Sequence, residues 1–278
     1  MRAAVATLLL VLLSASASAR QSFDRGLTIF APRPLPGEPL AEFTTRFKAE
    51  HQNRSHNVRQ AALRLLGVTL LPGQALSYNR VVGPRDEHLG FRMAPAIDRG
   101  KYVDQSGGGV CQPSSTLHAA AVIGGLEITE RYAHTWTPVY IAAGFDAAVS
   151  YGVRDLKLRN PHPFAVRIAV DADNDRVTVR LFSDAPRSAW NQLETTVRNV
   201  RPFKTIVESD PNMGPGTERL ELYGLEGMTV DRAVVTGRPG RSLARRHVDG
   251  DLYVPRDAII MAGVPIDTES ALAEPLGR

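Results

Sequence analysis

The sequence contains a single cysteine, Cys111, so no disulfide can form within the chain. The N-terminus makes this a constraint on folding, because it has the features of a secretory signal: Arg2, the apolar run Ala3–Leu13, and small residues ending at Ala19. Exported proteins enter compartments where disulfides commonly form. This chain must instead depend on an apolar core, which its hydrophobic fraction of 43% allows.

Removal of residues 1–19 would leave about 260 residues, enough for one large domain or two modest ones. The signal is too short to span a membrane and no later apolar run reaches that length, so we expect no transmembrane segment in the mature protein. We predict a secreted, periplasmic or cell-envelope-associated protein. The net charge of +4 fits an anionic envelope polymer as partner, and the absence of a nucleic-acid-binding motif argues against nucleic acid.

Hydrophobic periodicity predicts an α+β domain with an antiparallel sheet, followed by a small all-β module. The predicted organisation is a signal peptide over 1–19, a proline-rich lead-in over 20–46, the α+β domain over 47–182, a linker over 183–193, the β module over 194–265 and a tail over 266–278. The expected elements of the first domain are a helix over 41–66, short strands around Pro72-Gly73, a helix over 112–123, strands over 126–132, 137–142 and 146–152, and a hairpin over 164–182.

Three glycines, residues 107–109, precede Cys111 at the start of the predicted helix 112–123. A helix N-terminus stabilises a thiolate, which is the reactive form of cysteine. The helix rises roughly 18 Å, and a returning strand over 126–132 spans roughly 23 Å. The chain should therefore bring His134 back to the level of Cys111, so we predict a cysteine nucleophile with a histidine base.

A carboxylate would fix the tautomer of His134, and two aspartates follow it. If residues 137–152 form an ordinary hairpin that turns near Gly144, Asp146 lies at its tip, roughly 20 Å from the histidine. Asp155 would lie back at the open end of that hairpin. We therefore predict Asp155 as the third catalytic residue and a turn-stabilising role for Asp146.

The glycines would leave backbone N–H groups uncovered and let a substrate carbonyl approach the thiol. The predicted binding residues are Gly108, Gly109, Gln112, Ser115 and Asp146. Two alternatives remain open: a buried structural Cys111, and a metal or redox site that uses His118, His134 and His162. The histidine spacing matches no zinc pattern, so no metal and no other cofactor is predicted.

The segment from Phe47 to Phe182 resembles the VanW family, which is named for an accessory protein encoded with vancomycin-resistance genes. The stretches that carry the resemblance are RSHNVRQAA, LLPGQALSYNRVVGP, GGGVCQPSSTLHAAAVIGGLEITER and AHTWTPVYIAAGFDAAVSYGVRDLKLRN, in the family's order. The order cysteine, helix, strand, histidine also resembles the core of transglutaminase-like and papain-like enzymes. The stretches LYGLEGMTVDRAVVTGRPG and DLYVPRDAIIMAG resemble a G5-type module, which often accompanies cell-wall proteins.

These patterns leave two main functional hypotheses. The first is an envelope enzyme that uses Cys111, His134 and Asp155 to hydrolyse or transfer amide bonds, plausibly in peptidoglycan peptides. The second is a non-catalytic module that binds cell-wall peptide or glycan, in which Cys111 is structural. Peptidoglycan or another envelope polymer is the expected partner in both.

Overall fold

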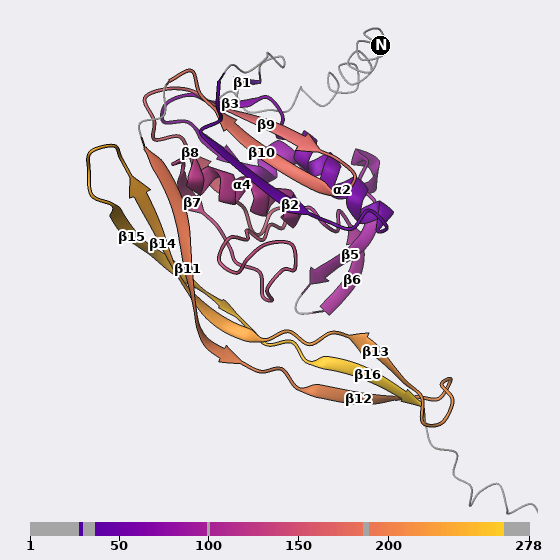
Figure 1. Cartoon of the computed structure of the whole chain (residues 1–278). Helices are drawn as coiled ribbons and strands as arrows, with labels where there is room; N and C mark the ends of the chain where they lie inside the picture. The colour runs from indigo at the N-terminus through magenta and orange to yellow at the C-terminus, as the bar shows by residue number, and fades with distance from the viewer. Residues whose placement is uncertain (1–27, 30–36, 99–100, 186–188, 264–278) are drawn as a thin grey trace, which may run out of the picture.

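The computed structural model describes residues 28–29, 37–98, 101–185 and 189–263 (Figure 1). The predicted signal peptide, most of the lead-in and the predicted tail lie outside the described residues. Within the described ranges, no helix is long and apolar enough to cross a membrane.

A five-stranded antiparallel sheet covers two helices in the first domain (Figure 1). Its strands alternate between buried and more exposed side chains, as in β9, so that one face packs on the core. Leu181 and Ile168 from this face are almost fully buried. In sheet order the strands are β1 (Thr28–Ile29), β3 (Val68–Leu70), β9 (Val166–Ala172), β10 (Arg176–Phe182) and β2 (Ala41–Arg46), and the helices are α2 (Gln52–Leu63) and α4 (Cys111–Ile123).

Smaller elements complete the first domain. They are the antiparallel sheet β4 (Ala75–Ser77), β8 (Lys157–Arg159) and β7 (Glu127–Glu130), the hairpin β5 (Met93–Asp98) and β6 (Lys101–Ser106), and the short helices α3 (Tyr78–Val82) and η2 (Glu87–Leu89). Residues 131–156 connect β7 to β8 with no helix or strand, apart from an isolated bridge between Ser150 and Arg154. We call this segment the site loop.

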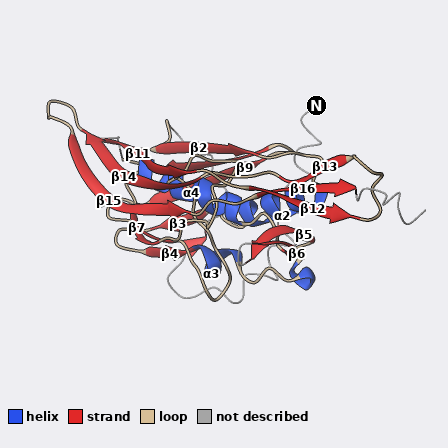
Figure 2. Cartoon of the chain, turned by 90° about the horizontal axis from the view of Figure 1, so that it is seen from below, coloured by secondary structure: helices blue, strands red, loops and turns tan. Residues whose placement is uncertain are grey.

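In the described residues from 189 to 263, all regular elements are strands, as predicted for the second module. Two three-stranded sheets lie at opposite ends of the elongated molecule (Figure 2). Only β12 and β16 pair in parallel among the described strands. The sheets are β11 (Trp190–Arg201), β14 (Gly227–Gly237) and β15 (Ala244–Tyr253), and β12 (Thr205–Asp210), β16 (Ala258–Gly263) and β13 (Glu218–Leu222).

The prediction of a mixed domain with mostly antiparallel sheets is confirmed, but two local predictions are wrong. Residues 41–46 form β2 rather than the start of a helix, because they pair with β10 and alternate inward and outward side chains. The strands predicted over 137–142 and 146–152 are absent from the site loop, which is irregular. Within the segment predicted as a linker, 183–193, β11 begins at Trp190, and the linker itself stays a prediction.

Asn57 of α2 anchors the glycine turn that leads into α4. Its side chain is fully buried. The amide nitrogen donates to the carbonyls of Arg92 (2.8 Å) and Gly108 (3.0 Å), and its oxygen accepts from the Arg92 N–H (2.8 Å). The Asn57 amide therefore links α2 both to Arg92, just before β5, and to Gly108, just after β6.

We expect Asn57→Ala to lower the free energy of unfolding by about 3 kcal/mol, because it leaves buried backbone groups without partners. Asn53→Ala is the matched control, since Asn53 lies one turn earlier on α2, is exposed and makes one bond, to Met93 O. That control should change stability by less than about 0.5 kcal/mol. Urea denaturation measures both, and equal effects would show that Asn57 is not an anchor.

Candidate active site

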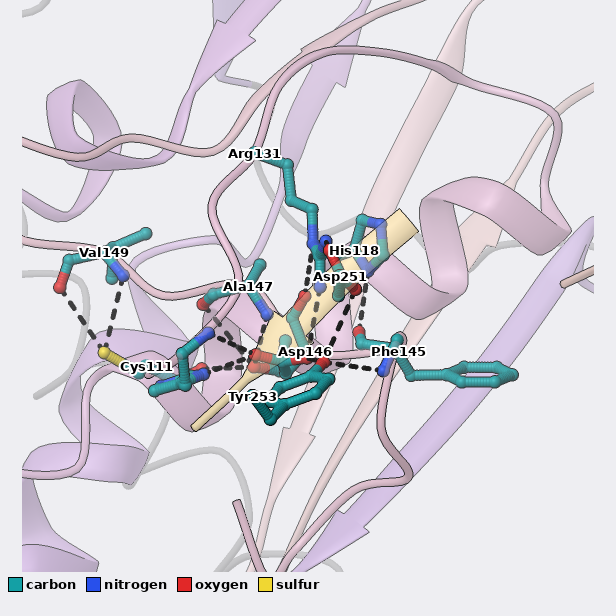
Figure 3. Close-up of polar contacts among 12 residues, drawn as sticks. Cys111, His118, Arg131, Phe145, Asp146, Ala147, Val149, Asp251 and Tyr253 are labelled. Atoms are coloured by element: carbon teal, nitrogen blue, oxygen red, sulfur yellow. Dashed lines mark hydrogen bonds and ion pairs between the residues drawn. The ribbon is translucent and has the colours of Figure 1, made fainter. Parts of the chain in front are cut away.

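Cys111 is the first residue of α4, and its half-buried side chain faces the site loop. The thiol donates to the Val149 carbonyl at 3.4 Å, and the Val149 N–H lies 3.5 Å from Sγ (Figure 3). The prediction that Cys111 lies at a helix N-terminus is confirmed. The thiol is therefore held between a helix end and an irregular loop.

The three glycines before Cys111 are explained by close packing around the turn. A Cβ at Gly107 would lie 2.5 Å from the Cβ of Arg85, and one at Gly108 would lie 2.3 Å from the carbonyl oxygen of Ala94. Gly109 has φ +105 and packs against α2. Each position excludes a side chain for a structural reason, and the predicted binding role of Gly108 and Gly109 stays a prediction.

His134 reaches the thiol from the site loop. The imidazole is close enough to Cys111 for each group to shift the pKa of the other toward its charged form. Its Nδ1 lies 2.6 Å from Oδ2 of Asp146, and its backbone N–H donates to the same oxygen at 2.8 Å. Because Asp146 engages Nδ1, the ring nitrogen that remains for the thiol is Nε2. The three side chains form a Cys–His–Asp series in which the carboxylate fixes the orientation of the imidazole.

The prediction that Asp155 orients His134 is wrong. Asp155 accepts hydrogen bonds from the Ser77 hydroxyl (2.5 Å) and from the backbone N–H groups of Asn79 and Leu156 (2.8 Å each). It therefore secures the start of α3 and the end of the site loop. The error came from the assumed hairpin over 137–152: since that segment is irregular, Asp146 folds back to His134 instead of lying at a distant tip.

Gln112 and Ser115, two predicted binding residues, hold neighbouring elements to α4. Gln112 is fully buried, and its amide donates to Thr45 Oγ1 at 3.1 Å. The Ser115 hydroxyl donates to the Cys111 carbonyl at 2.8 Å and accepts from the Ala147 N–H at 2.9 Å. Ser115 thus attaches the site loop one turn below the thiol, and direct ligand contact by either residue stays a prediction.

The other two histidines of the metal hypothesis, His118 and His162, bond to backbone carbonyls and do not form one group of ligands with His134. Nδ1 of His118 lies 2.7 Å from the Phe145 carbonyl, and Nε2 of His162 lies 2.9 Å from the carbonyl of Gly124. Gly124 follows the C-terminal end of α4, a full helix length of roughly 18 Å from Cys111. Among the residues that the structure describes, no group of three potential ligands is placed to hold a metal ion.

The charges around Cys111 favour the thiolate. Burial raises the pKa of the thiol, but the hydrogen bond and charge of His134, the Val149 backbone and the charge of Arg85 together hold that pKa below its ordinary value. For His134, burial lowers the pKa, while the bonds to Asp146 and Cys111 outweigh it and raise the pKa to about 9. The two shifts act together, because each favours the charged form of one partner in a thiolate–imidazolium pair.

Asp146 is fully buried and has partners from both modules (Figure 3). Its Oδ1 accepts from Nη2 of Arg131 at 3.1 Å and from the hydroxyl of Tyr253 at 2.5 Å. The Gly144 N–H donates to the same hydroxyl at 2.7 Å. Nη1 of Arg131 forms an ion pair with Asp251 at 2.5 Å. Two residues of β15 thereby complete the environment of a carboxylate in the site loop.

Sequence reasoning missed Arg131, Tyr140, Asp251 and Tyr253. The hydroxyl of Tyr140 lies 3.3 Å from Oγ of Ser115, and its ring meets the ring of His134 edge-on at 6.4 Å between centroids. A signal was present for two of them: Asp251 and Tyr253 alternate in DGDLYV, which places an acid and a tyrosine on the same face of one strand. An inward-facing acid in a strand indicates a buried partner.

The structure brings Cys111, His134 and Asp146 together on an α+β domain with an attached β module. Residues 53–182 match the family model described as VanW like protein, so the chain contains a domain of the VanW family. The earlier resemblance to that family is confirmed.

Two relatives have curated descriptions. The uncharacterized protein YoaR of Bacillus subtilis is 34% identical over 146 residues, which cover 52% of this chain and 48% of that protein. The vancomycin B-type resistance protein VanW of Enterococcus faecalis is 28% identical over 163 residues, which cover 56% of this chain and 59% of that protein. The chain thus spans about half of the length of these relatives.

Two solved structures are similar to part of the chain. A G5 domain of an IgA1 protease has a TM-score of 0.20 and 19% identity, covering 28% of this chain and 90% of that chain. The HP0197-G5 crystal structure has a TM-score of 0.16 and 16% identity, covering 27% of this chain and 97% of that chain. Both of these solved structures are G5 domains.

We expect the alkylation rate of Cys111 to rise with pH at a midpoint below the value of about 8.5 for a free cysteine. Asp146→Asn should move this midpoint upward, because it removes the charge that raises the pKa of His134. Asp155→Asn is the control and should leave the midpoint in place. Iodoacetamide labelling followed by mass spectrometry measures both, and a shift with the control alone would contradict the assignment of Asp146.

We expect Tyr253→Phe to lower the free energy of unfolding by about 2 kcal/mol, since it leaves a buried N–H at Gly144 and an oxygen of Asp146 each short of a partner. Tyr223→Phe is the control within the same module, because Tyr223 is 74% exposed. Thermal denaturation measures both variants. Equal Tm values for the two would show that the hydroxyl of Tyr253 adds no stability.

Proposed function

We propose that this chain is an exported cell-envelope protein that cleaves or transfers amide bonds of peptidoglycan peptides through Cys111. The observation that carries the proposal is the series Cys111, His134, Asp146, in which a half-buried thiol at a helix N-terminus meets an imidazole oriented by a buried carboxylate. Support for the envelope comes from the VanW-like domain, from the description of its Enterococcus faecalis relative as a vancomycin resistance protein, and from the sequence of the expected signal peptide.

The proposed reaction has two steps. The Cys111 thiolate attacks the carbonyl carbon of an amide, and an S–C bond forms while the C–N bond breaks. The His134 imidazolium donates its proton to the leaving amine, which leaves a thioester on the protein and a neutral imidazole. Water or a second amine then attacks the thioester, His134 accepts its proton, and the thiolate is released.

Each neighbouring residue has one role in this scheme. Asp146 holds the imidazole with Nδ1 engaged and stabilises the imidazolium electrostatically. Arg131 and Tyr253 keep Asp146 ionised: burial raises the pKa of this carboxyl, but the bonds from His134, Arg131 and Tyr253 outweigh it and hold the pKa well below the usual range. The N-terminal end of α4 stabilises the thiolate.

Activity requires a deprotonated thiol and a protonated imidazole at the same time. The rate should therefore rise as the pH passes the lowered pKa of Cys111 and fall as the pH passes about 9, where His134 loses its proton. We expect Cys111→Ala to abolish the reaction and His134→Ala to slow it by about 10²- to 10⁴-fold. Asp155→Asn serves as the matched control with near wild-type activity.

The measurement is incubation of the purified protein with peptidoglycan peptides, followed by an acid quench and intact-protein mass spectrometry. A thioester adduct on Cys111 that hydroxylamine removes is the expected result. Retained binding of peptidoglycan by Cys111→Ala, with no adduct and no change in the peptides for the wild-type protein, would instead establish a non-catalytic binding protein.

A further inference from the structure

Arg85 lies beside the candidate site in the segment that follows α3. Its guanidinium carbon lies 5.7 Å from the ring centroid of Tyr78 and 5.6 Å from that of Tyr151. The side-chain stem packs against Gly107 of the glycine turn. Arg85 is thus held between two aromatic rings, at a fixed place next to the turn.

Both aromatic rings belong to segments that hold Cys111. The hydroxyl of Tyr78 donates to the carbonyl of Val110, the residue before the cysteine, at 2.8 Å. Tyr151 follows Val149 by two residues, and the backbone of Val149 contacts Sγ of Cys111. The segments that carry Tyr78 and Tyr151 therefore contact both the guanidinium of Arg85 and the surroundings of the thiol.

The hydrogen bonds of Arg85 within the protein go to neutral groups. Nη1 donates to the carbonyl of Gly83 at 2.6 Å, and Nη2 donates to Oδ1 of Asn79 at 2.7 Å. Nε is buried and has no hydrogen-bond partner in the part of the chain that the structure describes. Within those same residues, no carboxylate lies at ion-pair distance from Arg85, whereas Arg131 has two such partners.

A buried cation without a paired anion is costly, because desolvation is not offset by a close opposite charge. Burial accordingly lowers the pKa of Arg85, while the nearby charges of Tyr78, Cys111 and Asp155 partly oppose that effect. The guanidinium remains charged in proteins, and its planar fork matches the two oxygens of a carboxylate. The arrangement is that of an anion site with part of its hydrogen-bonding capacity unused.

We propose that Arg85 binds a carboxylate of the substrate next to Cys111, so that the substrates are peptides with a free carboxylate beside the amide that the thiol attacks. This inference rests on the proposed function. Asn79 and Gly83 fix the two terminal nitrogens, and the aromatic rings fix the plane of the guanidinium. Arg85 is then a specificity-determining residue rather than part of the proton transfer between Cys111 and His134.

Two alkylating reagents test the inference without any turnover. Iodoacetate and iodoacetamide both form an S–C bond with Cys111 and release iodide, but only iodoacetate carries a carboxylate. We expect the ratio of the iodoacetate rate to the iodoacetamide rate to be higher at Cys111 than for free cysteine. Arg85→Gln should lower this ratio about tenfold, as expected for the loss of one charged hydrogen bond. Arg85→Lys, which keeps the charge, should give an intermediate ratio.

Arg80→Gln is the matched control, because it removes the same charge from an exposed position on α3 and should leave the ratio unchanged. A folded Arg85→Gln variant with the wild-type ratio would overturn the inference. If that variant does not fold, a protection experiment on the wild-type protein tests the inference instead. N-acetylalanine, which has a free carboxylate, should slow the labelling of Cys111 by iodoacetamide, and N-acetylalaninamide should not. Equal protection by the two compounds would overturn the inference. A slow thiol with a high ratio would count against the proposed function while supporting the carboxylate site.

Discussion

The buried carboxylate of Asp146 is the interaction on which the rest of the site depends. Removing a carboxylate from water costs several kcal/mol unless opposite charge and hydrogen-bond donors replace the water. Here Arg131 supplies the charge, and the Tyr253 hydroxyl, the His134 backbone and the His134 ring supply donors. An irregular segment of chain can hold one conformation because so many donors converge on one side chain.

The same cluster explains why His118 of α4 and His134 of the site loop have opposite character. His134 faces a carboxylate and a thiol, and both favour its charged form. His118 faces two arginines: burial first, and then the charges of Arg131 and Arg232, lower its pKa to about 3. The neutral ring accepts from Nη2 of Arg232 at 3.2 Å, so its proton lies on Nδ1 and is donated to Phe145. Direct contact with Asp146 favours a charged His134, whereas His118 beside the two arginines stays neutral.

Much of this arrangement follows from local sequence patterns, and the part that does not has a clear physical cause. The glycine turn, the helix from Cys111, the strand after it and the β9–β10 hairpin are short-range features, fixed by backbone preferences and alternating burial. These features suffice to bring His134 near the thiol. The choice between Asp146 and Asp155 depended on the path of the site loop, which follows from contacts with α4 and β15 rather than from local propensity. Alternating residues in 137–152 therefore suggested strands that do not form.

The contact between Asp146 and Tyr253 joins residues 107 positions apart in the chain. During synthesis Cys111 and His134 emerge well before β15, and the site loop cannot take its final path until β15 has folded against it. Contacts of such long sequence separation form late, because closing a long loop costs entropy before the contact stabilises anything. The surroundings of Cys111 are therefore completed late, when most of the chain has already folded.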